Sequence, residues 1–256
     1  MGIIRKLRSF KRCMMPSRSD FGSAGKNAII GFPVYITAPK AVHIEENAVI
    51  RLGTKILNNK TEHVYIGKYT VVGVNCVIVT NGHRSTVGIP HVLLGASHIN
   101  DKSKDIHIGE DVWIGANVTI LAGADLGRGC IAGACSTVTK PVPPYALVTG
   151  SPAKIVGVKF SIEQILEHEK ALYPASERMS REELEALFAQ YYEGKKVFGV
   201  QTDFTKEDLE ALEKGKKLRG YIEPVIEDKE VKITPPHWLI INKFHCIGGN
   251  AMLKAA

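Results

Sequence analysis

Four histidines lie in or beside a polar segment, residues 79–106, and have the side chains best suited to acid–base chemistry. They are His83, His91, His98 and His107. The ordinary pKa of an imidazole is about 6.5, so a neutral ring is available as a general base near pH 7. A histidine in a polar loop is usually an ordinary surface residue, and the spacing of these four does not exclude a substrate-holding role for any of them. The elements around the segment must therefore show which histidine is placed for chemistry.

The polar segment interrupts a six-residue repeat that is clearest over residues 108–142. Every sixth position is apolar, and these positions are Ile108, Ile114, Ile120, Leu126, Ala132 and Val138. Four of the six residues that follow them are glycine, namely Gly109, Gly115, Gly127 and Gly133. A second series, four positions after the first, is small or β-branched and consists of Val112, Val118, Ala124, Cys130, Ser136 and Val142. A fixed hexapeptide period is the signature of a parallel β-helix.

The period has a physical meaning. A short strand followed by a tight turn, three times round, makes a triangular coil of about 18 residues, and successive coils stack about 4.8 Å apart. One residue in six then points into a narrow core that accepts a branched aliphatic side chain. The turns need small residues, and we expect the glycines to supply backbone conformations with positive φ. Such a rod offers surfaces and grooves to a ligand rather than a deep pocket.

The repeat also covers residues before the polar segment, at Ile44, Ala48, Ile50, Ile66, Thr70, Val72, Cys76 and Ile78. Its phase slips between Ile56 and Ile66, which predicts a loop over residues 58–63. The interruption over residues 79–106 is much longer. Long irregular loops in a compact repeat usually carry function, so this loop is the first place to look for a site.

The first 20 residues are basic and fit a short helix with Ile3, Leu7, Phe10 and Met14 on one face. Such a helix suits peripheral association with an anionic membrane, or it packs on the body or on a neighbouring subunit, which is the commoner arrangement. The segment lacks an uninterrupted apolar stretch and a small-residue cleavage site, so we do not expect a signal peptide. We assign residues 1–26 to a basic N-terminal arm.

Residues 159–256 have a different, mostly helical pattern. Three capping boxes predict three helices, and they are Ser161 with Gln164, Ser180 with Glu183, and Thr205 with Asp208. The expected stops are Pro174, Gly194 and Gly215. Roughly the last forty residues match no clear pattern.

The composition indicates a soluble globular chain of one or two domains, because no apolar run approaches the ~20 residues needed to cross a bilayer. The five cysteines are odd in number and lack metal-type pairing, so we expect free thiols in a reducing, cytoplasmic compartment. The formal net charge is +7, and six basic residues against one acidic residue place +5 of it in the first twenty positions. The remainder is close to neutral, which argues against a nucleic-acid partner.

Three segments resemble those of the hexapeptide-repeat acyltransferases: TNGH at residues 80–83, VWIGANVTI at 112–120 and GSPAK at 150–154. Over roughly residues 30–158 the chain is similar to the sugar O-acetyltransferase branch, which includes galactoside and maltose acetyltransferases. The resemblance implies a mainly β chain with a left-handed parallel β-helix over residues 27–158. A helical arm would precede it, and a mostly α-helical extension over residues 159–256 would follow. The resemblance also implies a homotrimer with active sites at the subunit boundaries.

In that family an acetyl group passes from the thioester of acetyl-CoA directly to a hydroxyl group, so the resemblance implies acetyl-CoA as co-substrate and a sugar or glycan as acceptor. His83 occupies the position of the general base, and Asn81 and His91 are candidates for substrate contacts. A base usually needs an acceptor that orients it. The local neighbours of His83 offer only Thr80, Asn81 or a backbone carbonyl.

A cofactor groove is expected along the edge of the coil. Trp113 precedes an inward isoleucine and should point outward, as a wall for the acyl and pantetheine end and, in a trimer, opposite His83 of another subunit. Backbone amides near Gly115 and Ala116 are candidate donors, and lysines suit the phosphates. The full set is Trp113, Gly115, Ala116, Gly133, Ala134, Thr139, Lys140, Lys154 and Lys159. Family members often have an arginine shortly after the GSPAK-like segment, a region where this chain has Gly157.

Other functions fit parts of the sequence. An N-acetyltransferase for an amino sugar would use the same base and cofactor, whereas a drug acetyltransferase would favour an aromatic-rich segment after the loop histidine, which is absent here. A non-catalytic assembly module would not bind acetyl-CoA. A zinc site like that of the γ-class carbonic anhydrases would need a close histidine pair, but the four loop histidines are eight, seven and nine residues apart. We therefore predict no metal site.

Overall fold

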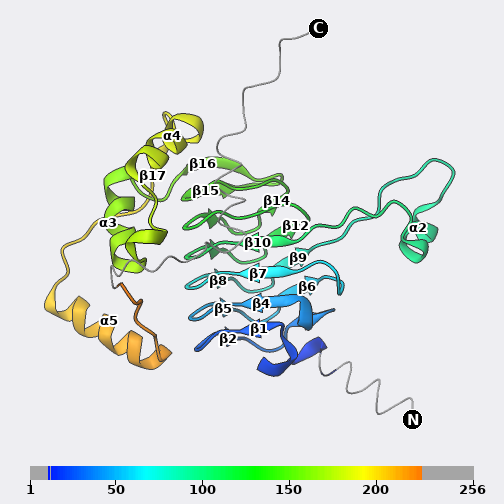
Figure 1. Cartoon of the computed structure of the whole chain (residues 1–256), viewed down its shortest axis with the longest axis horizontal. Helices are drawn as coiled ribbons and strands as arrows, with labels where there is room; N and C mark the ends of the chain where they lie inside the picture. Colours follow the sequence, from blue (N-terminus) through cyan, green and yellow to red (C-terminus); the bar gives the residue numbers. More distant parts are fainter. Residues whose placement is uncertain (1–10, 12, 227–256) are drawn as a thin grey trace, which may run out of the picture. The chain divides into compact units, whose positions relative to one another are not determined.

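The computed structural model describes residue 11 and residues 13–226 (Figure 1). The described residues form two compact units. One unit contains the chain up to Phe160 together with Lys195–Glu223, and the other contains Ser161–Gly194. The predicted N-terminal helix falls largely outside the described part of the chain, and so does the unassigned C-terminal segment from residue 227 onward.

The first unit is a stack of short parallel strands that form three sheets (Figure 1). The four-stranded sheet contains β1 (Ser23–Ala24), β4 (Val42–Ile44), β7 (Val64–Ile66) and β10 (Ile106–Ile108). The five-stranded sheet contains β3 (Tyr35–Ile36), β6 (Lys55–Leu57), β9 (Val77–Val79), β12 (Thr119–Leu121) and β14 (Thr137–Val138). The third sheet contains β2 (Ile29–Ile30), β5 (Val49–Ile50), β8 (Val71–Val72), β11 (Trp113–Ile114), β13 (Ile131–Ala132), β15 (Ala146–Thr149), β16 (Lys154–Val158) and β17 (Lys196–Val197).

Successive strands visit the three sheets in turn, and beyond β10 the face of the four-stranded sheet is continued by isolated bridges at Leu126 and Val142. The predicted parallel β-helix is confirmed. It starts earlier than the repeat in the sequence shows, because β1 to β3 already form a coil and are preceded by the 3₁₀ turn η1 (Arg18–Asp20). A second 3₁₀ turn, η2 (Pro39–Ala41), leads into β4. At the far end, β15 and β16 pair antiparallel and stop the regular stacking.

The inward series forms the core of the coil. Its six members, from Ile108 to Val138, are each at most 2% exposed. Residues one coil apart lie in register, as Ile114 does with Ala132. Because every coil repeats the same inward positions, burial of apolar side chains continues along the rod and each coil stabilises the next.

The glycines of the repeat have a different role from the expected one. Positive φ occurs three positions after five of the six inward residues, at Asp111, Asn117, Gly123, Gly129 and Cys135, whereas Gly115 does not adopt it. A Cβ on Gly115 would lie 2.6 Å from the backbone nitrogen of Ala134 in the next coil. The glycine is needed because two backbones approach closely there, whereas asparagine, aspartate and other residues make the left-handed turns.

Two loops leave the coil where the repeat breaks, as the sequence predicts. The short loop over residues 58–63 joins β6 to β7, and the long loop over residues 80–105 joins β9 to β10. The base of the long loop is closed by two backbone hydrogen bonds. Lys104 donates to Thr80 over 2.9 Å, and Lys102 donates to Gly82 over 2.8 Å. The remainder of the loop projects away from the stacked coils (Figure 1).

The long loop contains a short helix, α2 (His91–Ser97), which the sequence does not predict. The helix begins after Pro90, whose extended backbone is its N-cap. Leu94 is fully buried and is the apolar anchor of the helix. The helix ends at His98, which has the left-handed conformation and donates its backbone N–H to Leu94 over 2.9 Å.

The three predicted capping boxes are all present. They begin α3 (Ile162–Leu172) and α4 (Arg181–Tyr191) in the second unit, which also contains the 3₁₀ turn η3 (Ala175–Glu177), and α5 (Lys206–Arg219) in the first. The predicted end of the third helix at Gly215 is wrong. The helix continues to Arg219, and Gly220 takes the left-handed conformation that stops it. No helix of the described residues combines the length and the apolar character needed to cross a membrane.

Candidate active site

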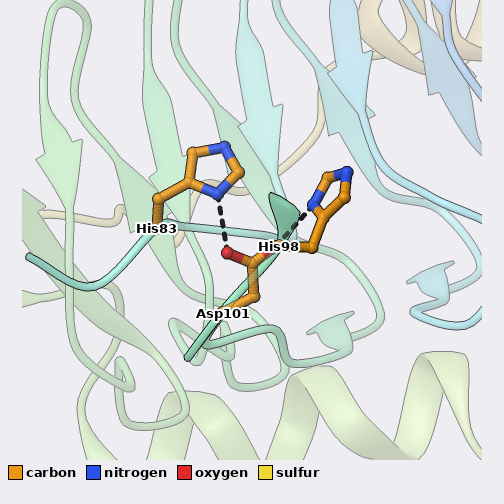
Figure 2. Close-up of side chains that lie close together, drawn as sticks. All are labelled: His83, His98 and Asp101. Carbon is orange, nitrogen blue, oxygen red and sulfur yellow. Dashed lines mark hydrogen bonds and ion pairs between the residues drawn. The ribbon is translucent and has the colours of Figure 1, made fainter. Parts of the chain in front are cut away.

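Three side chains of the long loop meet at one carboxylate. Nδ1 of His83 lies 2.7 Å from Oδ1 of Asp101, and Nδ1 of His98 lies 2.8 Å from Oδ2 of the same residue. Figure 2 shows the carboxylate held between the two rings. The ring centroids of His83 and His98 are 5.8 Å apart, and the rings are tilted by 48°.

The hydrogen bonds determine which ring nitrogen carries the proton. They lower the pKa of Asp101 below its ordinary value, with His83 as the larger cause and His98 as the second. An ionised carboxylate can only accept hydrogen bonds, so both Nδ1 atoms donate. In the neutral state each ring therefore has its free lone pair on Nε2. This is the tautomer that a general base needs if it is to take a proton at Nε2.

Helix α2 lies beside the outer nitrogen of His83. A Cβ added to Gly95 would lie 3.7 Å from Nε2 of His83, an ordinary van der Waals distance. The His83 side chain is nevertheless 35% exposed. The ring is thus flanked on one side by the helix and open to a ligand on another.

The contact of Asp101 with His83 is one that the sequence alone does not reveal. The sequence leaves the orienting group of His83 unidentified, since its neighbours offer only Thr80, Asn81 or a backbone carbonyl, and the structure places a carboxylate there from 18 residues later in the chain. The loop closes between Lys102 and Gly82, and this closure brings the carboxylate to the histidine. No spacing rule predicts such a closure, because it depends on how the whole loop folds.

The other loop histidines have different surroundings. His91 is exposed at the start of α2, and its Nε2 lies 3.4 Å from Oγ of Ser85. His107 lies on β10, where its ring stacks on Tyr65 with centroids 4.7 Å apart. Of His91, His98 and His107, the structure therefore places only His98 next to His83. Asn81 is half-buried at the base of the loop.

Trp113 and His83 lie on different faces of the coil. Trp113 is on β11 of the eight-stranded sheet and is 59% exposed, as its place before the inward Ile114 predicts. His83 follows β9 of the five-stranded sheet, in the loop that leads to the four-stranded sheet. The two side chains can face each other only if a second copy of the chain is present, and that pairing stays a prediction.

The backbone amides of the expected groove divide into two classes. Gly115 donates its N–H to Ala132 and Gly133 donates to Val148, each over 2.8 Å. These amides are occupied by coil stacking, so the expected donor role of Gly115 has no support. In the described part of the chain, the amides of Ala116 and Ala134 have no hydrogen-bond partner. They occupy equivalent positions in consecutive coils.

The polar residues expected at the nucleotide end also differ in their surroundings. Thr139, Lys140 and Lys154 are exposed. Lys159 is not, because its ammonium lies 2.6 Å from Oδ2 of Asp111 and its side chain is only 16% exposed. The ion pair occupies Lys159, and we remove this residue from the expected phosphate contacts.

In the described part of the chain, His83, His98 and Asp101 are also the one group of three or more histidine, cysteine or acidic side chains whose ligand atoms lie close enough to share an ion. The sequence argument against a histidine pair used linear spacing, and it does not hold in three dimensions. His83 and His98 are 15 residues apart in the chain, yet they share one carboxylate.

Comparison with known proteins identifies the coil. The family of bacterial transferase hexapeptide repeats (six repeats) matches residues 105–140. A chloramphenicol acetyltransferase of Morganella morganii is 48% identical over 46 residues, which is 18% of this chain and 22% of that protein. A probable macrolide acetyltransferase of Lysinibacillus sphaericus is 47% identical over 47 residues, 18% of this chain and 26% of that protein. The chain thus spans only about a quarter of the length of the curated relatives it matches.

Solved structures resemble a longer part of the chain. A galactoside acetyltransferase in complex with coenzyme A has a TM-score of 0.52 at 25% identity, covering 69% of this chain and 87% of that one. A maltose O-acetyltransferase of Clostridium difficile has a TM-score of 0.50 at 26% identity, covering 56% and 73%. A hexapeptide-repeat acetyltransferase of Vibrio cholerae, complexed with acetyl coenzyme A, has a TM-score of 0.54 at 24% identity, covering 62% and 87%. This chain carries the bacterial transferase hexapeptide repeat and has the left-handed β-helix fold of the hexapeptide-repeat acetyltransferases.

Proposed function

We propose that the protein is an acetyl-CoA-dependent O-acetyltransferase that acetylates a sugar hydroxyl, with His83 as the general base. The observation that carries the proposal is the 2.7 Å contact between Nδ1 of His83 and Asp101, which leaves Nε2 as the free acceptor. The similarity of the fold to galactoside and maltose acetyltransferases supports the choice of acceptor.

The geometry supports direct transfer. The acceptor oxygen attacks the carbonyl carbon of the thioester, a C–O bond forms and the C–S bond breaks. The hydroxyl proton moves to Nε2 of His83 and then to the sulfur of coenzyme A, which leaves as the free thiol. Asp101 stabilises the imidazolium that exists between these two transfers and keeps the ring in the reactive tautomer.

We assign the cofactor to the outer edge of the coil. Trp113 offers an exposed aromatic wall, and the unpaired amides of Ala116 and Ala134 offer donors to the carbonyl groups of a pantetheine arm. The exposed Thr139, Lys140 and Lys154 suit the nucleotide phosphates, because a lysine ammonium is a flexible point charge.

A homotrimer would complete this site. In one chain His83 and Trp113 lie on different faces, so the base and the cofactor wall must come from two copies. Light scattering on the purified protein should give the mass of three chains. Co-expression of His83→Ala with Trp113→Ala should restore part of the activity that each variant lacks alone, because some boundaries would contain neither substitution. A monomer with full activity would contradict this arrangement.

The test of the function is thiol release from acetyl-CoA in the presence of a panel of sugars, nucleotide sugars and amino sugars. We expect one or more sugars to give turnover, and we expect His83→Ala to lower kcat by at least about a hundredfold while acetyl-CoA still binds. Val87→Ala is the control, because Val87 is fully exposed in the same loop. Turnover retained by His83→Ala would reject His83 as the base.

An antibiotic hydroxyl is a second candidate acceptor. The matches to chloramphenicol and macrolide acetyltransferases favour it, although they cover only 46 and 47 residues of this chain. Chloramphenicol and a macrolide therefore belong in the same panel. Acetylation of either in preference to every sugar would replace the sugar acceptor but would keep the roles of His83 and acetyl-CoA.

A further inference from the structure

The candidate site contains a second imidazole that the proposed reaction does not use. His98 donates from Nδ1 to Oδ2 of Asp101, while His83 donates from Nδ1 to Oδ1. One carboxylate thereby accepts from Nδ1 of both rings, and in its neutral form each ring keeps a hydrogen-bond acceptor at Nε2. The site thus offers a ligand two acceptors of the same kind.

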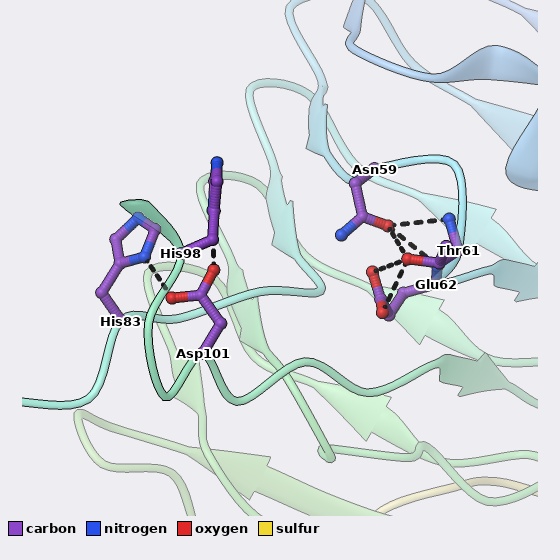
Figure 3. A network of polar contacts seen from close by, with 6 residues as sticks. All are labelled: Asn59, Thr61, Glu62, His83, His98 and Asp101. Carbon is purple, nitrogen blue, oxygen red and sulfur yellow. Dashed lines mark hydrogen bonds and ion pairs between the residues drawn. The ribbon is translucent and has the colours of Figure 1, made fainter. Parts of the chain in front are cut away.

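The two acceptors face the same side. Figures 2 and 3 view the cluster from different directions, and in both the Nε2 atoms of His83 and His98 lie on the side of the rings away from Asp101. The ring centroids are 5.8 Å apart. The His98 side chain is 65% exposed, so its Nε2 can be reached by a ligand bound at His83.

The place of His98 is set by the end of α2. Its φ of 56° and ψ of 25° place it in the left-handed region, at the end of α2, where glycine or asparagine is the common residue. A glycine would adopt this conformation without strain. The left-handed turn that ends α2 carries the imidazole of His98 to the second oxygen of Asp101.

We propose that His98 binds the acceptor and that the acceptor presents two neighbouring hydroxyl groups, one to each imidazole. The inference rests on the proposed transfer at His83. The hydroxyl at His83 loses its proton to Nε2 as its oxygen attacks the thioester, and this proton ends on the sulfur of coenzyme A. The neighbouring hydroxyl donates to Nε2 of His98 and is not consumed.

This arrangement selects a diol over an isolated alcohol. A hydroxyl at His98 gains one hydrogen bond, whereas an acceptor that lacks it places an apolar group against a polar ring nitrogen. His98 selects the acceptor and orients it. His83 acts on the proton, so the two histidines should affect different kinetic constants.

The test uses three methyl glycosides, of glucose, galactose and mannose, together with their monodeoxy analogues, and follows thiol release from acetyl-CoA. Removal of the hydroxyl next to the acetylated one should lower kcat/KM of the wild type about tenfold. In His98→Asn the same removal should lower kcat/KM less than about twofold; asparagine is chosen because it tolerates the left-handed backbone. For the parent sugar, KM of this variant should rise while kcat stays within about threefold of the wild-type value. The amide oxygen of His98→Asn lies on a shorter side chain and does not reach the place of Nε2, whereas the longer side chain of His98→Gln can bring its accepting oxygen closer and should recover part of the discrimination. Val92→Ala, exposed on α2, is the control.

The outcomes separate the two proposals. Suppose that the wild type acetylates these sugars, but removal of the neighbouring hydroxyl lowers kcat/KM as much in His98→Asn as in the wild type. The role of His98 in binding a diol then fails, and the proposed function stands. If a lone amino group replaces the diol as the preferred acceptor, the inference also fails. If the wild type binds acetyl-CoA but releases thiol with none of the sugars, sugar O-acetylation fails, and the diol inference fails with it.

Discussion

The coil and the long loop of the first unit follow opposite rules. In the coil each position repeats every six residues, the inward side chains are buried, and backbone hydrogen bonds join each coil to the next. In the loop over residues 80–105 nothing repeats, one leucine of α2 is buried, and two backbone hydrogen bonds close the base. The loop nevertheless holds the histidine and carboxylate cluster that we assign to chemistry.

The difference explains why we assign the chemistry to the place where the repeat breaks. An inward position of the repeat must fit the side chains that lie one coil away from it, so the stack restricts which residues it can hold. A loop has no such requirement. It can bring together residues 83, 98 and 101, because its own closure determines their distances.

The largest expected effect comes from breaking the coil. In Gly115→Val the new Cβ would meet the backbone of Ala134 at 2.6 Å, and backbone atoms cannot move aside as a flexible side chain can. We expect the free energy of unfolding to fall by at least about 3 kcal/mol, with much of the protein aggregated. Urea unfolding followed by circular dichroism measures this. A variant as stable as the wild type would contradict the close approach of consecutive coils.

The next largest effect is expected from a substitution that disrupts the His83, His98 and Asp101 cluster and leaves the coil unchanged. In Asp101→Asn an amide replaces the carboxylate, and its NH₂ group can no longer accept from one of the two rings. We expect kcat to fall on the order of 10²–10⁴-fold, with thermal stability unchanged. Enzyme kinetics and thermal unfolding provide the comparison. Unchanged kcat would mean that Asp101 does not orient His83.

The same carboxylate predicts a pH dependence. Hydrogen bonds from His83 and His98 lower the pKa of Asp101, so the carboxylate is ionised throughout the neutral range. Because the pKa is lowered, the two hydrogen bonds to the Asp101 carboxylate are fully present above the ordinary pKa of a carboxyl group. They are lost as the pH falls through the lowered pKa of Asp101. Nitrogen-15 NMR of the imidazoles should show Nδ1–H on both neutral rings, and Asp101→Asn should change the tautomer of at least one.

A pair of core substitutions compares the two regions directly. Leu94→Ala removes the buried anchor of α2, so we expect kcat/KM to fall about tenfold with little change in Tm, because only the loop opens. Ile114→Ala, in the core of the coil, should lower the free energy of unfolding by about 2–5 kcal/mol while the folded fraction keeps its kcat. Thermal unfolding and kinetics on both variants measure the difference. Equal effects of the two on Tm would show that the loop is not a separate element.

Two lysines test the cofactor edge. Lys140 is exposed, and Lys140→Ala should raise KM for acetyl-CoA about threefold to tenfold. Lys159 is paired with Asp111, so Lys159→Ala should leave that KM unchanged and lower stability by roughly 1 kcal/mol at most, since both groups retain some contact with water. The reverse result would restore Lys159 as a phosphate contact.

The smallest effect is a gain in stability. Gly215 lies inside α5, and an added Cβ would meet no atom within 4 Å. Gly215→Ala should therefore stabilise the protein by at most about 1 kcal/mol, because alanine favours the helix over glycine. Together with Gly115→Val it forms a matched pair of glycine substitutions. Destabilisation in Gly215→Ala would show that the helix does not continue through this position.

Elements with a local or periodic cause could be predicted from the sequence. The six-residue period predicts the inward series, the two loops where it breaks, and the exposed place of Trp113. The capping boxes predict the starts of α3, α4 and α5, because a cap needs only residues within one turn. The helix end at Gly215 was missed since a glycine can also be accommodated inside a helix.

The sequence by itself thus determined the coil and the helix starts, through a repeated pattern and local caps, and the motif around His83 made this histidine the candidate base. Only the tertiary structure decided that Asp101 is the partner of His83, that His98 joins it, and that Asp111 occupies Lys159. The physical reason is that the His83–Asp101 and Lys159–Asp111 contacts join residues 18 and 48 positions apart, through the closure of one loop and the stacking of coils, which no short window of sequence contains. His98 and Asp101 are only 3 positions apart, but His98 has its place because α2 ends there in a left-handed turn.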